Sequence, residues 1–458
     1  MPVDKYKKMR WLNRPLILLF LALIVVLITR FPFLSAGYGA DADAWRVANT
    51  ARNIAVSGEY AASRFPGYPL QELVYSLIWN AGPQVLNGLS ALMCAAGILF
   101  FMLCFRHYGG KDYFPAGLAL AFVPVIYINS TSAIDYVWAL AFVMASVYCL
   151  LRKLPILAGI LLGLAIGSRI TSAAMLIPGA VMLWHGADGR NYRRTLLRFV
   201  LTALLVGGLC FLPVILKYGT EFLTFYRGKY PLLQSIITRA GEGVWGMIGA
   251  IALVLSLAFG LWMRKKKTEN VTIPGNVARK DINAWILVVV IYSAAFFLLP
   301  HESGYLITPL PFLFFLLSHF LHRKIFLFFC VAMLLSPFID IGKSGVGAGA
   351  ILRDHEGRMN QVAFAKQVKE KANHLTRKSV VVAGWYLPLI EADSPVGGPG
   401  IVEFQYLLDS NSLLQSRSRG DDLYYLPGIR EYNLQTRGVD IMLYGATPLI
   451  DITSPGNK

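Results

Sequence analysis

Long apolar runs separated by short polar segments dominate the chain up to about residue 341. The first two runs cover residues 15–34 and 83–105, and both are long enough to cross a bilayer as a helix. Similar or slightly shorter runs follow at 114–129, 134–151, 155–168, 170–184, 196–216, 244–263, 283–300, 305–321 and 325–341. The pattern predicts an all-α polytopic membrane protein with about 11 transmembrane helices.

The apolar segment 155–184 has two interpretations. Its two halves are each slightly short for a complete span, and a polar break at Arg169 divides them. Basic residues flank the segment, with Lys153 before it and Arg190 after it. Because basic loops face the cytoplasm, both ends should lie on that side. The segment should therefore form a helical hairpin or two short spans, with Arg169 near the outer side.

A soluble pattern replaces the apolar one near residue 343. It predicts a helix over 359–375 and strands over 379–385 and 439–444. Helical and extended segments of this kind, with Pro and Gly between them, are typical of a small α/β domain. We expect two domains, a transmembrane domain at 1–342 and a small external α/β domain at 343–458.

Charge is distributed unevenly along the chain. The sequence is 56% hydrophobic and 15% charged, and its formal net charge is +17. Residues 343–458 are almost balanced, so the excess belongs to the transmembrane part, where Lys and Arg gather before residue 15 and between residues 263 and 281. This distribution follows the positive-inside rule and does not indicate a nucleic-acid partner. Segment 35–82 should then face the outside.

The external segment 35–82 is longer than a simple connection between two helices needs to be. Asp41 and Asp43 lie near its start, and Arg64 follows in a turn-rich stretch. A carboxylate in this position can act as a general base that deprotonates an acceptor hydroxyl. The alternative is that Asp43 caps a helix beginning at Ala44, because Asp is favoured at that position.

Further polar residues fall on the external side of the predicted topology. Arg169 interrupts apolar sequence, where a lone cation is costly, so it needs an anionic partner or a water-filled cavity. A phosphate group suits a guanidinium, and an ion pair with Asp135 is the alternative. Asp135 itself precedes a helix and could simply cap it. The candidate substrate-binding residues are Arg64, Asp135, Arg169, Lys229, His301, Glu302 and Tyr305.

Three stretches resemble the GT-C superfamily of polytopic glycosyltransferases, which includes protein O-mannosyltransferases, lipid A aminoarabinose transferases and dolichol-linked mannosyltransferases. DAWRVANTARNIAVSGEY at 43–60 is similar to the family's first-loop motif, in which an Asp begins a helix. LAGILLGLAIGSRITSAAMLIP at 157–178 looks like its Gly- and Leu-rich helix with a basic residue before Thr or Ser. PHESGYLITPLP at 300–311 is similar to its late-loop His-x-Glu pattern, with compressed spacing. Many relatives have adjacent acidic residues at the first-loop site, whereas this chain has Asp41-Ala42-Asp43, and the register favours Asp43.

The resemblance implies a GT-C-like fold and an inverting transfer of a sugar from a polyprenyl-phosphate-linked donor to an acceptor hydroxyl outside the cytoplasm. Asp43, or else Asp41, would be the general base, and cations such as Arg169, Arg64 or Lys229 would hold the donor phosphate. The acceptor could be a glycan, a lipid or a protein. A transporter or flippase of lipid-linked sugars is the alternative, although the internal repeats common in transporters are not seen.

Cofactor motifs are absent from the sequence. There is no phosphate-binding GxxxxGK[ST] loop, no Rossmann glycine pattern and no HExxH. Asp41, Asp43 and Asp135 offer oxygen ligands for a divalent metal, but they are too few and too far apart in the sequence to assign one. We therefore expect no cofactor and no nucleic acid, contact with membrane lipid, and a bacterial inner-membrane location with the active site on the periplasmic face.

Overall fold

The computed structural model describes residues 3–184, 189–224, 230–264, 273, 277–342, 345–392 and 401–450. The chain folds into two compact units. The membrane unit combines Met1–Tyr38 with Thr50–His355, and the C-terminal unit combines Gly39–Asn49 with Glu356–Lys458. The division falls at Glu356 instead of residue 343, and it assigns the segment with Asp41 and Asp43 to the C-terminal unit.

Helices dominate the membrane unit. Among the described residues, five segments are long and apolar enough to cross a bilayer, and several shorter apolar helices accompany them. The long ones belong to α1 (Val3–Arg30), α4 (Gly82–His107), α10 (Gly189–Tyr218), α12 (Glu242–Arg264) and α13 (Arg279–Leu298). The shorter ones include α7 (Tyr136–Leu151), α8 (Pro155–Ser168), α9 (Leu176–Leu183), α14 (Leu310–Phe320) and α15 (Arg323–Leu335). The prediction of an all-α polytopic membrane protein is confirmed.

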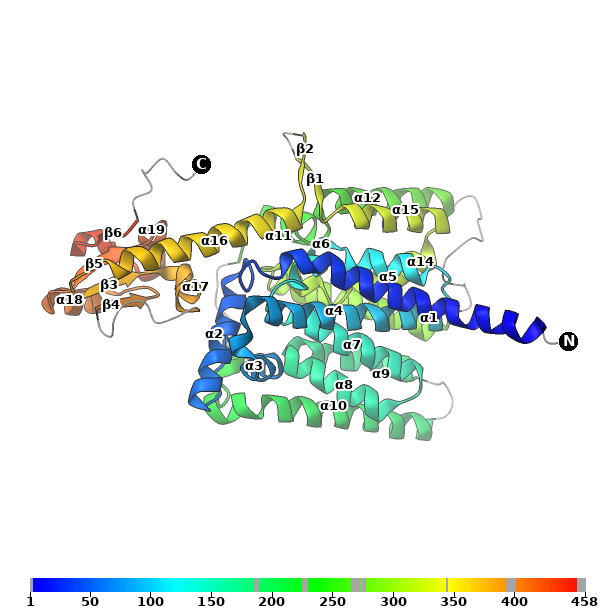
Figure 1. Ribbon diagram of the computed structural model, residues 1–458. Helices are drawn as coiled ribbons and strands as arrows, with labels where there is room; N and C mark the ends of the chain where they lie inside the picture. The colour runs from blue at the N-terminus through cyan, green and yellow to red at the C-terminus, as the bar shows by residue number, and fades with distance from the viewer. Residues whose placement is uncertain are drawn as a thin grey trace. The chain divides into compact units, whose positions relative to one another are not determined.

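Helices α4, α7, α8 and α10 pack side by side in that order (Figure 1). Small residues allow the close approach. A Cβ atom on Gly97 of α4 would lie 3.2 Å from the Cα atom of Ala141 of α7, and one on Gly163 of α8 would lie 2.5 Å from Val206 of α10. Packing through small residues is typical of membrane helices, because lipid supplies no hydrophobic driving force between them.

Two of the predicted spans are broken helices. Segment 114–129 forms α5 (Tyr113–Ala121) and α6 (Pro124–Asn129), which separate just before Pro124 because proline disfavours helical backbone in the preceding residue. Segment 155–184 is divided at Arg169, whose φ of −156° and ψ of 113° are extended. The chain then continues as the 3-10 helix η3 (Ile170–Met175) and α9. The predicted break at Arg169 is confirmed.

The remaining elements of the membrane unit are short. Helix α2 (Ala42–Ser57) begins in the C-terminal unit and ends in the membrane unit. The others are η1 (Phe31–Phe33), α3 (Pro69–Ser76), η2 (Trp79–Ala81), η4 (Glu221–Thr224), α11 (Leu233–Ala240), η5 (Ser303–Leu306), and the antiparallel strands β1 (Ile339–Gly342) and β2 (Gly345–Ala348).

The C-terminal unit contains a parallel four-stranded sheet in the order β4-β3-β5-β6. Its central strand β3 (Ser379–Val382) is buried along its whole length, as expected of a parallel strand covered on both faces. The other strands are β4 (Val402–Gln405), β5 (Asp422–Tyr425) and β6 (Thr447–Pro448). The helices are α16 (Ala350–Asn373), η6 (Gly384–Tyr386), α17 (Leu387–Glu391), α18 (Ser410–Ser418), α19 (Ile429–Arg437) and η7 (Ile441–Tyr444).

One strand prediction in this unit is wrong. Residues 441–444 form the 3-10 helix η7, although their apolar character suggested a strand over 439–444. Asp440 caps this helix by accepting a hydrogen bond from the amide of Met442, and Gly445 ends it in the left-handed region at a φ of 85°. Local capping therefore outweighs the apolar pattern in this segment.

Candidate functional site

Two arginines share one buried carboxylate in the membrane unit. Arg64 donates to Asp135 Oδ1 at 2.9 Å, and Arg169 donates to Asp135 Oδ2 at 2.6 Å. The Asp135 side chain is fully buried, while those of Arg64 and Arg169 are 14% and 11% exposed. A buried charge is tolerated only when it is paired, and here one anion serves two cations. One shared anion therefore holds the two guanidinium groups together.

Breaks in helical structure position all three side chains. Arg64 lies in the turn-rich segment before α3, and Arg169 lies in the extended link between α8 and η3. Asp135 occupies the N-cap position of α7, but its side chain makes no capping hydrogen bond and instead faces the two arginines. The capping interpretation of Asp135 is therefore not what the structure shows. The ion-pair interpretation of Arg169 is observed, with Arg64 as an additional member.

Tyrosine rings surround the guanidinium groups. The Arg64 Cζ atom lies 4.0 Å from the ring centroid of Tyr68, and the Arg169 Cζ atom lies 4.1 Å from that of Tyr136 and 5.0 Å from that of Tyr305. Cations at such distances interact favourably with aromatic faces, more strongly where water is excluded. Tyr305 was predicted from sequence, whereas Tyr68 and Tyr136 were missed, and the contact of Tyr136 with Arg169 joins distant segments.

Glu302 reaches the same cluster through a tyrosine. The hydroxyl of Tyr136 donates a hydrogen bond to Glu302 Oε2, and the ring of Tyr136 lies against Arg169. The loop must approach closely, because a Cβ atom on Gly304 would lie 2.7 Å from the Tyr136 ring. Of the late-loop residues predicted from sequence, the structure brings Glu302 and Tyr305 to the cluster.

His301 and Lys229 have different outcomes. His301 lies beside Arg239, and burial first and the Arg239 charge second lower the pKa of its imidazole. Arg239 also donates to the carbonyl oxygen of Pro300 at 2.7 Å, which fixes this loop. The structure thus associates His301 with Arg239 at the start of the late loop. Lys229 lies outside the described residues.

A buried glutamate that the sequence reasoning missed holds the Arg64 segment in place. Glu72 of α3 is fully buried and accepts hydrogen bonds from the amide and hydroxyl of Ser63, the hydroxyl of Tyr60 and the amide of Tyr68. Burial raises the pKa of Glu72, and these hydrogen bonds oppose the rise. Since Ser63 and Tyr68 flank Arg64, Glu72 fixes the backbone on both sides of it. Glu72 is the one charged residue of α3, and this was the available signal.

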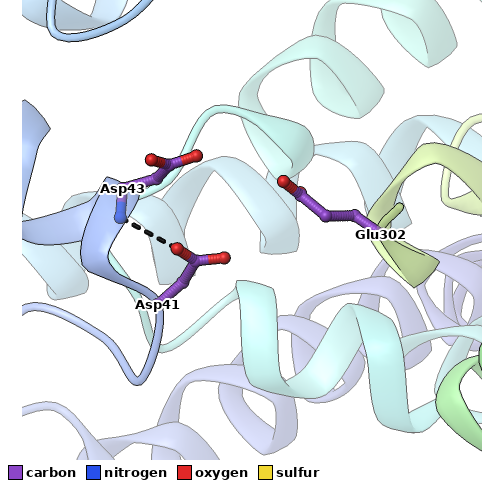
Figure 2. Close-up of side chains that lie close together, drawn as sticks. All are labelled: Asp41, Asp43 and Glu302. Atoms are coloured by element: carbon purple, nitrogen blue, oxygen red, sulfur yellow. Dashed lines mark hydrogen bonds between the residues drawn. The ribbon is translucent and has the colours of Figure 1, made fainter. Parts of the chain in front are cut away.

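Asp41 and Asp43 have different local roles in the C-terminal unit. Asp41 Oδ1 accepts a hydrogen bond from the backbone amide of Asp43 at 2.9 Å, as Figure 2 shows. Since α2 begins at Ala42, Asp41 is its N-cap and Asp43 lies in the first turn. The predicted capping role of Asp43 therefore belongs to Asp41. Glu302, also drawn in Figure 2, is part of the membrane unit.

The Asp43 carboxylate pairs with an arginine one turn along α2. Arg46 donates to Asp43 Oδ1 at 2.9 Å, and the Asp43 side chain is 13% exposed. Arg46 also acts electrostatically on Tyr406, whose hydroxyl lies 2.9 Å from that of Tyr432. A further hydrogen bond fixes the start of α2 within the C-terminal unit. Asn49 donates it to the carbonyl oxygen of Pro388.

A metal ligand role suits Asp135 poorly. Both of its carboxylate oxygens already face guanidinium groups, which repel a cation. Asp43 has one oxygen on Arg46, and Asp41 has one on a backbone amide.

Comparisons with known proteins gave structural likenesses alone. No family model matches the chain, and no curated protein matches it. ArnT from Cupriavidus metallidurans in the apo state has 14% identity and a TM-score of 0.46, covering 92% of this chain and 91% of that one. The same protein bound to undecaprenyl phosphate gives 14% identity and a TM-score of 0.45, with coverage of 89% and 88%.

A second similar structure is an oligosaccharyltransferase from Archaeoglobus fulgidus. It has 12% identity and a TM-score of 0.43, and the match covers 84% of this chain and 64% of that one. TM-scores below 0.5 do not establish a common fold, so the functional proposal below rests on the side chains of the site itself.

Proposed function

We propose that this protein is a membrane glycosyltransferase, which moves a sugar from a polyprenyl-phosphate-linked donor to an acceptor hydroxyl and inverts the anomeric carbon. The single observation that supports this best is the two-arginine cluster. The carboxylate of Asp135 holds the two guanidinium groups of Arg64 and Arg169 together. A polyprenyl-phosphate sugar carries an anionic phosphodiester, and a planar guanidinium offers paired donors to phosphate oxygens.

The cluster also suits the departure of the leaving group. When the bond between the anomeric carbon and the phosphate oxygen breaks, the leaving polyprenyl phosphate gains a further negative charge. Cations held in place beforehand stabilise such a developing charge without reorganisation. Asp135 fixes both guanidinium groups, and Glu72 fixes the backbone around Arg64. Both arginines are therefore positioned before the donor arrives.

An apolar pocket supports a lipid-linked donor. It has a volume of about 220 Å³ and contains Leu306, which follows the cluster residue Tyr305 directly in the chain. Its walls come from α12, α13 and α14 and include Val244, Trp245, Phe296, Leu306, Leu310 and Leu313. An apolar lining next to a cationic cluster matches a ligand that joins a hydrocarbon chain to a phosphate.

Asp43 is the proposed general base. Its carboxylate takes the proton from the acceptor hydroxyl while the acceptor oxygen attacks the anomeric carbon from the face opposite the phosphate. One carbon–oxygen bond forms and one breaks, and the phosphate keeps the electron pair of the broken bond. Asp43 is preferred over Asp41 because Asp41 already accepts the capping hydrogen bond of α2. We further propose a bacterial inner membrane, with the reaction on the periplasmic face.

The test combines transfer and donor binding. Purified protein is incubated with radiolabelled polyprenyl-phosphate sugars and a panel of glycan, lipid and protein acceptors. Arg169→Ala should weaken donor binding by about 10- to 100-fold, since hydrogen bonds to charged groups contribute about 1.5–3 kcal/mol. Arg169→Lys should retain part of the binding, because it keeps the charge and loses the paired donors.

A matched control is Arg323→Ala, because Arg323 also pairs with a carboxylate of the membrane unit, that of Asp112. It should leave donor binding unchanged. Normal donor binding by Arg169→Ala together with lower thermal stability would make the cluster a structural ion-pair network. Movement of labelled lipid across vesicles without sugar transfer would support the alternative of a flippase.

A further inference from the structure

The strand order of the C-terminal sheet creates a position at which ligands commonly bind. Strand β3 pairs with β4 on one side and with β5 on the other, all in parallel. The chain therefore leaves the carboxyl end of β3 toward one side of the sheet and that of β5 toward the other. In open parallel sheets, ligands bind outside the carboxyl ends of the strands where the strand order reverses.

Aromatic side chains gather at the carboxyl ends of these strands, which we call the carboxyl edge of the sheet. Trp385 follows β3 and is 38% exposed, and its ring centroid lies 5.0 Å from that of Tyr432 in α19. Tyr406 follows β4, and its hydroxyl meets that of Tyr432 at 2.9 Å. The Trp385 ring also covers the turn after β5, where a Cβ atom on Gly428 would lie 3.3 Å from it. Three segments thus contribute to one aromatic surface with hydroxyl groups on it.

The helix N-terminus at this edge is a poor site for an anionic ligand. Gly428 precedes α19, where helix amides could bind a phosphate, but Glu431 lies in the first turn of that helix and Trp385 covers the glycine. Neutral hydroxyl groups and a flat aromatic face instead suit a sugar ring, which has an apolar C–H face and a hydroxyl rim. Tyr and Trp combine an apolar body with a polar group in this way.

The same edge is connected to the proposed general base. Arg46 interacts electrostatically with Tyr406 and pairs with Asp43 at 2.9 Å. The desolvation of Tyr406 and its hydrogen bond with Tyr432 raise the pKa of its phenol to about 12, so it stays a neutral hydroxyl at physiological pH. All four groups belong to the C-terminal unit. A sugar on Trp385 and Tyr432 would lie at the end of a network that leads to Asp43.

We propose that the carboxyl edge of the C-terminal sheet, with Trp385, Tyr406 and Tyr432, binds a carbohydrate acceptor and presents its hydroxyl toward Asp43. This inference rests on the proposed function and assigns the acceptor class that the function leaves open. Trp385 supplies the stacking surface. Tyr406 and Tyr432 supply hydroxyl groups, and Arg46 joins them to the carboxylate.

The experiment measures glycan binding by the full-length protein in detergent. Chitotriose, cellotriose and maltotriose serve as neutral probes in titration calorimetry, and undecaprenyl phosphate is titrated separately as the donor-side probe. Trp385→Ala should weaken binding of the preferred trisaccharide by about tenfold or more, as expected for the loss of one packed aromatic contact. Trp385→Phe should retain part of the affinity, and both variants should bind undecaprenyl phosphate normally.

The matched control is Trp79→Ala, which removes another exposed tryptophan, 36% exposed in η2 of the membrane unit. It should bind the trisaccharide as the unchanged protein does. The inference fails if none of the three glycans binds, or if Trp385→Ala binds them with unchanged affinity. Loss of undecaprenyl phosphate binding on Arg169→Ala is a separate result, so the donor site and the acceptor site succeed or fail independently.

Discussion

Asp135 and Asp43 are both acidic residues at the start of a helix, but their surroundings differ. Asp135 is completely buried and holds two guanidinium groups, one on each oxygen. Asp43 is partly exposed and forms an ion pair with an arginine on its own helix. With a guanidinium group on each oxygen, the carboxylate of Asp135 fixes the geometry of both arginines. The comparison favours a structural role for Asp135, and Asp43 stays the proposed general base.

Replacement of Asp135 should have the largest effect. Asp135→Asn leaves two buried guanidinium groups without their shared anion, and breaking a buried pair in this way costs about 3–5 kcal/mol. We expect a clear fall in the thermal unfolding temperature together with loss of sugar transfer. Asp112→Asn is the control, because its partner Arg323 is half exposed and can turn to solvent. Equal thermal stability of the two variants would contradict the structural role of Asp135.

Replacement of Asp43 should remove activity and leave the fold intact. Asp43→Asn keeps the size of the side chain and removes the proton acceptor, and loss of a general base lowers the rate by about 10²–10⁴-fold. Thermal unfolding and undecaprenyl phosphate binding should stay close to those of the unchanged protein. If Asp43→Asn transferred sugar at a normal rate while Asp41→Asn did not, the base would be Asp41.

Replacement of Glu72 should lower stability, less than replacement of Asp135 does, and should also weaken donor binding. All four of its hydrogen-bond partners are donors, so Glu72→Gln places an amide N–H group against at least one of them. An unsatisfied buried group of this kind costs about 1–3 kcal/mol. We expect weaker donor binding, measured by calorimetry, because the Arg64 segment loses its support. Glu59→Gln in the same loop should change little, since its side chain is 80% exposed.

Replacement of Asp41 should have the smallest effect. Asp41→Asn keeps a side-chain oxygen for the amide of Asp43, and Asn caps helices about as well as Asp. Asp41→Ala removes the cap and should cost about 0.5–2 kcal/mol of stability. Differential scanning calorimetry of both variants measures the difference. A large loss of transfer by the Asn variant with normal stability would give Asp41 a chemical role beyond capping.

The sequence by itself determined the class of protein and the candidate charges. Runs of about twenty apolar residues, which bury their backbone hydrogen bonds within one helix, made the polytopic architecture readable from local pattern alone. Arg169 stood out because a cation in apolar sequence needs a partner. The break at that residue was predicted because the apolar runs on either side are each slightly short for a complete span. Arg64, Asp135, Glu302 and Tyr305 were also named from sequence, and the structure brings them to Arg169.

The tertiary structure alone decided which of these charges meet and what each one does. Asp135 could have been a helix cap, because a cap and an ion-pair partner have the same local sequence, and its contacts with Arg64 and Arg169 join segments 71 and 34 residues away. The four donors around Glu72 and the network from Asp43 through Arg46 to Tyr406 were likewise invisible in the sequence. Apolar periodicity is a local property, so it predicts the helices and the faces that they turn to lipid. Pairing of polar groups depends on how the whole chain folds.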